Sequence, residues 1–258
     1  MDDNTFHRVE RLVGAEGTDR LRRARVAVFG VGGVGSWTAE ALVRSGVGHI
    51  TIVDADCVAQ SNINRQLMAL QSTVGEPKVD LLARRFADIN PQAEVVALRE
   101  RYTADTADSF DLESYDVIID AIDSLADKAL LIMRATAARH PRFFSSMGAA
   151  LKMDPTRVRV DEFWKVKGCR LAAALRQRFK RQGVRPRRKF KCVYSDELLP
   201  NLGPDEADTS GAMTYGKVAV NGAMAHITAI FGMTLAGLTV QAILEKKAVF
   251  EGTEDINT

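Results

Sequence analysis

The chain has 258 residues, of which 46% are apolar, enough for one large α/β domain or two small ones. Its formal net charge is only +2, but Lys165–Lys191 holds twelve Lys or Arg and no Asp or Glu, while the remainder has 23 basic and 33 acidic residues. A cationic segment on an otherwise acidic chain suggests a polyanionic partner. The three cysteines are not closely paired, which argues against a disulfide framework and a four-cysteine zinc site.

Short β-branched runs alternate with helical patterns over the first part of the chain, which predicts a Rossmann-like, doubly wound, mostly parallel α/β sheet with helices on both faces. After about residue 155 the pattern weakens, and no linker is evident. We therefore interpret 1–258 as a single domain, with a first part at 1–155 and a C-terminal α/β extension at 156–258 that contains the basic segment. Strands are predicted at 25–30, 49–54, 93–98, 115–123 and 142–146, and helices at 34–46, 78–90 and 128–140.

Two stretches bear on where the protein resides. The start of the chain, MDDNTFHRVERLVG, is charged and lacks the apolar core of a signal peptide, so we expect a cytoplasmic protein. Residues 218–244 carry no formal charge and are long enough to span a bilayer. They also contain several polar residues and three glycines, which favours a buried core helix with close packing, so no membrane is expected.

A glycine-rich run, GVGGVG, joins the first predicted strand to the first predicted helix. It contains the spacing G-x-G-x-x-G at Gly30, Gly32 and Gly35, with Gly33 between them. Glycines there let the backbone approach phosphate, and the helix start offers free N–H groups. Asp54, which ends the next strand, is placed to accept hydrogen bonds from ribose hydroxyls. This combination favours a nucleotide-binding loop over the simpler interpretation of a tight turn between a strand and a helix. It does not distinguish NAD, FAD and ATP as the nucleotide.

Further polar residues follow the carboxyl ends of the predicted strands. These are the run SNINRQ (residues 61–66), Lys78 in GEPKV and Asp123 in DAIDS. In a parallel sheet they meet at one crevice, where Arg65 and Lys78 would supply cations and Asp123 a ligand for Mg²⁺. Each has a simpler interpretation: a solvated lysine, a helix N-cap at Asp123, or an ion-pair partner at Arg65. Their occurrence together favours attack on a triphosphate over hydride transfer.

The motifs from residue 8 to residue 125 resemble those of the ubiquitin-activating-enzyme-like adenylating enzymes, which include the activators of bacterial sulfur-carrier proteins. The resemblance implies ATP and Mg²⁺, with the ribose on Asp54, phosphates on the S-N-x-x-R-Q and Lys residues, and Mg²⁺ on Asp123. The implied binding residues are Gly30, Gly32, Gly33, Gly35, Asp54, Asp56, Asn62, Arg65, Gln66, Lys78 and Asp123.

The same resemblance implies a homodimer. In that family an arginine from the N-terminal segment of the other protomer lies near the phosphates. Arg11 fits this role by spacing, and Arg8 is the next candidate. The implied catalytic residues are therefore Arg11, Arg65, Lys78 and Asp123, with Cys192 as an undecided fifth.

The second half lacks the two C-x-x-C zinc pairs usual in sulfur-carrier activators, so no structural zinc is expected. It has instead KCVYSDE after the basic segment, which resembles the tRNA threonylcarbamoyladenosine dehydratases. Those enzymes use ATP to activate the threonyl carboxylate of a modified adenosine, which then cyclises with loss of water. Nine of the sixteen residues from Arg176 to Lys191 are Lys or Arg, with Phe179 and Phe190 interleaved. This composition predicts tRNA binding through 165–191 in preference to a merely solvated surface.

Cys192 is the ambiguous residue. It follows two nearby cations, Lys189 and Lys191, which should favour its thiolate. It is a nucleophile, a relay thiol that would imply a sulfur-relay or carrier protein, or a structural residue. Cys57 and Cys169 have no motif and are interpreted as packing residues.

Three function classes follow from these patterns. The first is a tRNA-modifying dehydratase that forms an acyl-adenylate. The second is an activator of the C-terminus of a ubiquitin-like sulfur carrier, and the third is a nicotinamide-dependent oxidoreductase. The basic segment and the missing zinc pairs favour the first, while the modified nucleoside and the binding of a monovalent cation are left open.

Overall fold

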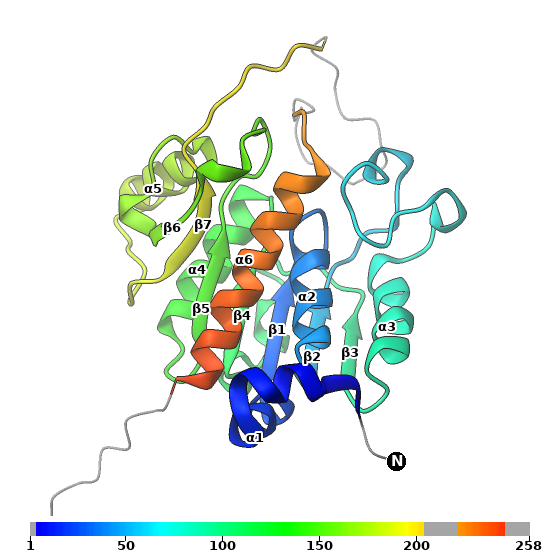
Figure 1. Cartoon of the computed structure of the whole chain (residues 1–258). Coiled ribbons are helices and arrows are strands. Elements are labelled where there is room, and N and C mark those ends of the chain that lie inside the picture. Colours follow the sequence, from blue (N-terminus) through cyan, green and yellow to red (C-terminus); the bar gives the residue numbers. More distant parts are fainter. Residues whose placement is uncertain (1–3, 204–220, 246–258) are drawn as a thin grey trace, which may run out of the picture.

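The computed structural model describes residues 4–203 and 221–245 of the chain. Its centre is a seven-stranded sheet in the order β3-β2-β1-β4-β5-β7-β6 (Figure 1). Neighbouring strands are parallel except for β6 with β7, so the predicted Rossmann-like, mostly parallel sheet is confirmed. The strands are β1 (Arg25–Phe29), β2 (His49–Val53), β3 (Glu94–Leu98), β4 (Val117–Asp120), β5 (Arg142–Ser146), β6 (Val158–Glu162) and β7 (Lys191–Ser195).

Helices cover both faces of the sheet. One face carries α1, α2, α3 and α6, and the other carries α4 and α5 (Figure 1). The arrangement follows the doubly wound pattern that alternating strands and helices predict. The helices are α1 (His7–Arg23), α2 (Gly35–Arg44), α3 (Lys78–Ile89), α4 (Leu125–Ala137), α5 (Arg170–Gln182) and α6 (Ala225–Leu244).

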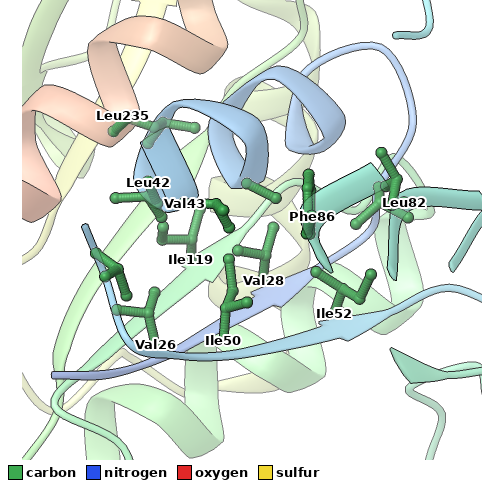
Figure 2. Packing of buried hydrophobic residues seen from close by; sticks show 14 of the residues in the cluster. Val26, Val28, Leu42, Val43, Ile50, Ile52, Leu82, Phe86, Ile119 and Leu235 are labelled. Carbon is green, nitrogen blue, oxygen red and sulfur yellow. The ribbon is translucent and has the colours of Figure 1, made fainter. Parts of the chain in front are cut away.

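The two faces receive alternate residues of each central strand. In β1, Val26 and Val28 point into the core beneath α2, whereas Ala27 and Phe29 belong to the core beneath α4 and α5. Figure 2 shows the first of these cores, in which the strand side chains pack against α2, α3 and the helix that carries Leu235. Burial on both faces explains why the central strands read as continuous apolar runs in the sequence.

The second half of the chain extends the same sheet. β7 pairs in parallel with β5, and β6 closes the edge by pairing antiparallel with β7. The basic segment therefore lies between two adjacent strands, because it connects β6 to β7. β6 is only partly buried along its length, which explains why the apolar pattern weakens after residue 155.

The uncharged stretch forms α6, which starts at Ala225; residues 218–220 lie outside the described part. By length and composition α6 is the one helix of the described residues that passes as a possible membrane span. Its residues Ile227, Phe231 and Leu235 are nevertheless fully buried against the sheet and α2. At Gly232 the helices come so close that an added Cβ would lie 2.6 Å from the Val34 carbonyl oxygen. These contacts are those of a core helix.

Two glycines of α6 provide a matched test of this packing. We expect Gly232→Ala to destabilise the fold by about 1–3 kcal/mol, because the new methyl group overpacks the contact with α2. Gly237 is exposed with nothing within 4 Å of an added Cβ. Gly237→Ala should stabilise by up to about 1 kcal/mol through helix propensity alone. Urea unfolding of both variants measures the free energy of unfolding. Equal changes of the same sign in the two variants would contradict the close contact between α6 and α2.

Candidate functional site

The glycine-rich loop makes a turn between β1 and α2 that only glycine accommodates. Gly30 has φ +83°, and a Cβ there would lie 2.8 Å from the carbonyl oxygen of Ala121. A Cβ at Gly35 would lie 1.8 Å from the carbonyl oxygen of Gly30. Glycine at both positions lets α2 begin directly over the end of β1. The free N–H groups and the positive dipole end of α2 therefore face the carboxyl edge of the sheet, where an anion would bind.

Asp54 connects this loop to the end of β2. Its carboxylate accepts hydrogen bonds from the Val31 N–H at 2.8 Å and from the Asp56 N–H at 2.9 Å. Burial raises the pKa of Asp54, and the charge of Lys78 opposes that rise. The Lys78 amine lies 3.9 Å from Asp54 Oδ1 and 2.8 Å from Asp56 Oδ2. The predicted ribose-binding acid is thus held in place by the glycine-rich loop and by the first residue of α3.

Lys78 is more enclosed than the sequence suggested. Its side chain is 5% exposed, and its amine already pairs with Asp56. The interpretation as a solvated first-turn lysine is therefore wrong. Lys78 neutralises two carboxylates at the strand end, and a phosphate contact would share the amine with them.

The SNINRQ run lies beside the glycine-rich loop. An added Cβ at Gly33 would lie 3.4 Å from Arg65 Cγ, and one at Gly32 would lie 3.7 Å from Gln66 Nε2. Asn62 is buried, and its Oδ1 accepts a hydrogen bond from the Ala59 N–H at 3.1 Å within the same loop. Two of the predicted binding residues, Arg65 and Gln66, therefore lie at the loop that the glycines form, and Asn62 supports the turn that precedes them.

Arg65 and Gln66 have polar atoms left for a ligand. The Arg65 guanidinium donates to the Ser61 carbonyl oxygen at 2.8 Å and to Asn64 Oδ1 at 2.9 Å, and it forms no ion pair within residues 4–203 and 221–245. Gln66 Oε1 is buried and lacks a hydrogen-bond partner in that same part of the chain. A buried acceptor without a partner is costly, and a donor on a bound molecule would satisfy it.

Asp120 and Asp123, both near the end of β4, have opposite environments. Asp120 is fully buried and pairs with Lys128, also fully buried, at 2.9 Å. Burial raises the pKa of Asp120, and Lys128 opposes that rise. The pair also holds the backbone of Ile122, whose N–H donates to Asp120 and whose carbonyl oxygen accepts from Lys128. Asp123 follows directly, is exposed, and forms no ion pair with another described residue.

Arg11 lies far from the loop of its own chain. It is exposed on α1, ahead of a kink at Gly14. α1 contacts the far end of α6, where Arg20 donates to the Leu244 carbonyl oxygen at 3.0 Å. Thr228, at the near end of α6, touches the glycine-rich loop. The two contacts are about 24 Å apart along the helix, and Figure 1 shows α1 at the opposite end of the strands from the loops that follow β2.

These features can be compared with those of known proteins. Residues 7–255 match the ThiF family. The chain belongs to the ThiF family. It is 39% identical over 248 residues to the tRNA threonylcarbamoyladenosine dehydratase of Bacillus subtilis, covering 93% of this chain and 94% of that protein. The resemblance to ubiquitin-activating-enzyme-like adenylating enzymes, and among them to these dehydratases, is confirmed.

A solved structure extends the similarity to three dimensions. The crystal structure of the E. coli tRNA N6-threonylcarbamoyladenosine dehydratase, TcdA, in complex with ATP matches with a TM-score of 0.82 and 34% identity, covering 93% of this chain and 94% of that one. By contrast, the sulfur carrier protein adenylyltransferase of Thermus thermophilus matches at 36% identity over 55% of this chain and 53% of that protein. The similarity to the dehydratases therefore includes the second half of this ThiF-family chain.

The environment of Cys192 in this ThiF-family protein differs from the sequence expectation. Its side chain lies on β7 and is fully buried, whereas Lys189 and Lys191, which precede it, are exposed. Alternation along a strand sends neighbouring side chains to opposite faces. Burial raises the pKa of the Cys192 thiol well above its ordinary value, and the nearby Lys128 only partly opposes this. The expectation that the flanking lysines favour its thiolate is therefore wrong, and this favours the structural interpretation.

The aromatic residues of the basic segment also differ from expectation. Phe179 and Phe190 are 1% and 6% exposed and pack around Phe163, so neither is available to stack on RNA. The exposed aromatic residue is Trp164, immediately before the segment, with 42% of its surface exposed.

Arg188 has a structural role that the sequence did not reveal. Its guanidinium donates to the carbonyl oxygens of Ala135 and Thr136 at 3.1 Å and of Pro141 at 3.0 Å. The first two are carbonyls in the last turn of α4, which have no partner inside that helix. Among the described residues, no cation of Lys165–Lys191 forms an ion pair with a carboxylate. The segment remains strongly cationic even with Arg188 committed to α4.

Two supporting residues were missed at the sequence level. Lys128 has a sequence signal, because it occupies a core-facing position in an apolar helical pattern, three and four residues before Leu131 and Ile132. A lysine there predicts a buried partner. Thr228 has no such signal, because the site residues that it touches, Arg65 and Gly33, lie more than 160 positions away in the chain.

The cysteines give a direct test of burial. Cys57 is partly exposed, while Cys169 and Cys192 are buried. We expect iodoacetamide to modify native Cys57 well before the other two, because burial keeps the reagent from the Cys169 and Cys192 thiols. Peptide mass spectrometry after timed quenching measures the order, with urea-unfolded protein as the control in which all three react. Early modification of native Cys192 would instead support a nucleophilic or relay role.

Proposed function

We propose that this ThiF-family protein is an ATP-dependent enzyme that dehydrates N6-threonylcarbamoyladenosine in tRNA by adenylating its carboxylate. The observation that carries the proposal is the extent of the similarity: the dehydratases match over both halves of the chain, including the basic segment. The sulfur-carrier activator matches about half of it. We also infer a cytoplasmic location, since tRNA would be the substrate.

The site offers a place for each part of ATP. The start of α2 and the glycine-rich loop would hold phosphate, since their N–H groups face the carboxyl edge of the sheet. Asp54 is oriented by Val31 and Asp56 and would accept from the ribose hydroxyls. Gln66 lies beside the glycine-rich loop, and its unpartnered Oε1 would accept a hydrogen bond from a donor of the nucleotide. Arg65 has no carboxylate partner within the described residues and would bind the triphosphate.

Asp123 fits the requirements of a Mg²⁺ site built on substrate phosphates. No group of three or more His, Cys, Asp or Glu among the described residues is placed to hold a metal ion. Mg²⁺ commonly binds through one or two carboxylates plus phosphate oxygens. Asp123 is exposed and unpaired, and the Asp120–Lys128 pair positions the backbone just before it. Bound Mg²⁺ would offset negative charge on the phosphates.

The chemistry then needs orientation and charge stabilisation. The threonyl carboxylate of the modified adenosine attacks the α-phosphate, which forms an acyl-adenylate and releases pyrophosphate. Arg65, with Lys78 nearby, offsets the charge that develops on the phosphate oxygens. The carbamoyl nitrogen then attacks the acyl carbon, loses its proton and expels AMP, which carries away the carboxylate oxygen. The second step is intramolecular and gains from proximity, so no protein nucleophile is required.

Conversion of defined tRNA tests the proposal. We expect the protein, with ATP and tRNA that carries threonylcarbamoyladenosine, to yield the nucleoside lacking one water, as measured by mass spectrometry. Asp123→Asn should lower this rate by about 100- to 1,000-fold without changing stability, because the residue is exposed and unpaired.

Asp88→Asn is the matched control. Asp88 is an exposed acid near the far end of α3 from Lys78, so its variant should convert tRNA at the wild-type rate. Failure of the wild-type protein to convert the marked tRNA would refute the proposed function. If instead it forms an adenylate on the C-terminus of a ubiquitin-like carrier, the sulfur-carrier alternative holds.

We further propose a homodimer in which Arg11 serves the site of the other protomer. The distance of α1 from its own glycine-rich loop supports action in trans. Mixing Arg11→Ala chains with Asp123→Asn chains should restore activity, because one site of each mixed dimer then combines an intact Arg11 with an intact Asp123. Each variant alone should be inactive. Mixed dimers as inactive as either parent would place Arg11 outside the partner's site.

A further inference from the structure

A groove at the end of α5 combines an aromatic surface with unpaired cations. Its cavity has a volume of about 550 Å³ and is formed by the last two turns of α5 and the turn that follows, together with Trp164, two residues after the end of β6. The residues that line it are Trp164, Arg176, Gln177, Phe179, Lys180, Gly183, Val184 and Arg185.

Trp164 and Arg185 form its open face. The Arg185 guanidinium carbon lies 5.4 Å from the centre of the Trp164 ring, within the range of a cation–π interaction. Trp164 is 42% exposed, and its ring is held edge-on against the buried Phe163, with ring centres 5.2 Å apart. The Trp164 ring is thus held by Phe163 and has Arg185 over it, and the residue still exposes 42% of its surface, so a base that stacks on the ring would displace or share the place of the Arg185 guanidinium.

The charges of the groove have no acidic partner. Arg176 donates to the Phe163 carbonyl oxygen at 3.0 Å and lies over the Phe163 ring. Lys180 is exposed. Neither these two nor Arg185 forms an ion pair with a carboxylate in the described part of the chain. Three cations that line the same groove as an exposed aromatic ring suit a ligand that has both a flat ring and negative charge.

The groove lies apart from the ATP site. β6, which leads directly to Trp164, is four strands from β1 in the sheet. At the usual strand spacing this is about 19 Å. A nucleotide bound at the glycine-rich loop cannot span both sites, whereas a folded RNA can.

We propose that this groove binds a nucleotide of the tRNA substrate outside the modified residue, with its base stacked on Trp164 and its flanking phosphates on Lys180 and Arg185. The inference rests on the proposed function and identifies where the basic segment grips the RNA. Stacking on an aromatic ring tolerates any base, and the cations contact the backbone, so the groove contributes affinity and little sequence specificity.

The fluorescence of Trp164 reports on this site. The chain has two tryptophans, and Trp37 lies on α2 with its Nε1 bonded to the Arg65 carbonyl oxygen. We expect unmodified tRNA transcript to quench wild-type emission on binding. Trp164→Ala should weaken tRNA affinity by about 5- to 150-fold, the loss of one stacked base. Trp164→Phe should retain most of the affinity and lose the quench.

The salt dependence of tRNA affinity distinguishes the contribution of charge from that of stacking. Arg185→Ala should reduce the slope of log affinity against log salt by about 0.7 to 0.9, while Trp164→Ala leaves the slope unchanged. Arg185→Lys keeps the charge and should keep the slope. ATP affinity and the midpoint of urea unfolding, measured on every variant, check that the fold is intact.

The outcomes distinguish this inference from the proposed function. If the wild-type protein dehydrates the marked tRNA but Trp164→Ala binds tRNA as tightly as wild type, or tRNA binds without quenching, the groove inference is wrong and the function stands. If the wild-type protein neither binds nor converts tRNA, both are wrong. Quenching by an acidic ubiquitin-like carrier protein in place of tRNA would overturn the inference and assign the groove to a protein partner.

Discussion

The close contact between Gly35 and the carbonyl oxygen of Gly30 is the constraint on which the site depends. No side chain fits there, since a Cβ on Gly35 would lie 1.8 Å from that oxygen. The contact brings the start of α2 over the end of β1 and exposes its N–H groups. Other parts of the site are then attached to this turn. Asp54 accepts from the Val31 N–H, and Trp37 of α2 donates to the Arg65 carbonyl oxygen at 3.2 Å.

The distribution of charge separates supporting residues from those that face a ligand. Lys128 and Asp120 form a fully buried pair at the end of β4, whereas the buried Lys78 pairs with the partly buried Asp54 and with the exposed Asp56. Removing one member of the Asp120–Lys128 pair should cost about 3–5 kcal/mol, because the other is left as a buried charge. Asp123 and the groove cations lack opposite charges in the described part of the chain. These unpaired groups are the ones to which the proposed function assigns phosphates, Mg²⁺ and RNA.

One continuous sheet carries both the proposed ATP site and the groove proposed to bind RNA. Because β7 adds directly to β5 and β6 adds to β7, the basic segment is fixed relative to the glycine-rich loop by the hydrogen bonds of the sheet. α6 strengthens this link by packing on α2 through Gly232 and on the central core through Leu235. A rigid separation suits adenylation of a nucleoside within a large RNA, because the RNA bound at one place is oriented at the other.

The sequence by itself determined the fold class, the glycine-rich turn, and the places of Asp54 after β2 and of Asp123 after β4. These follow from local patterns: the alternation of strands and helices, the spacing of glycines, and polar residues that come directly after strands. The family followed from the same motifs, since they encode a single local arrangement. The five strands predicted in the first half correspond to β1 to β5 with small changes at their ends.

The tertiary structure alone decided the contacts between residues that lie far apart in the chain. Cys192 and Lys191 are adjacent in the sequence, yet one is fully buried and the other exposed, so the charge of the neighbour does not control the thiol. In the sequence Arg188 does not differ from its basic neighbours. In the structure it lies at the end of α4 and donates hydrogen bonds to carbonyl oxygens of the last turn of that helix. Trp164 is exposed, whereas the neighbouring aromatic residues Phe163, Phe179 and Phe190 are buried in the core. Burial and pairing depend on which segments meet in space, and local sequence patterns do not specify those partners.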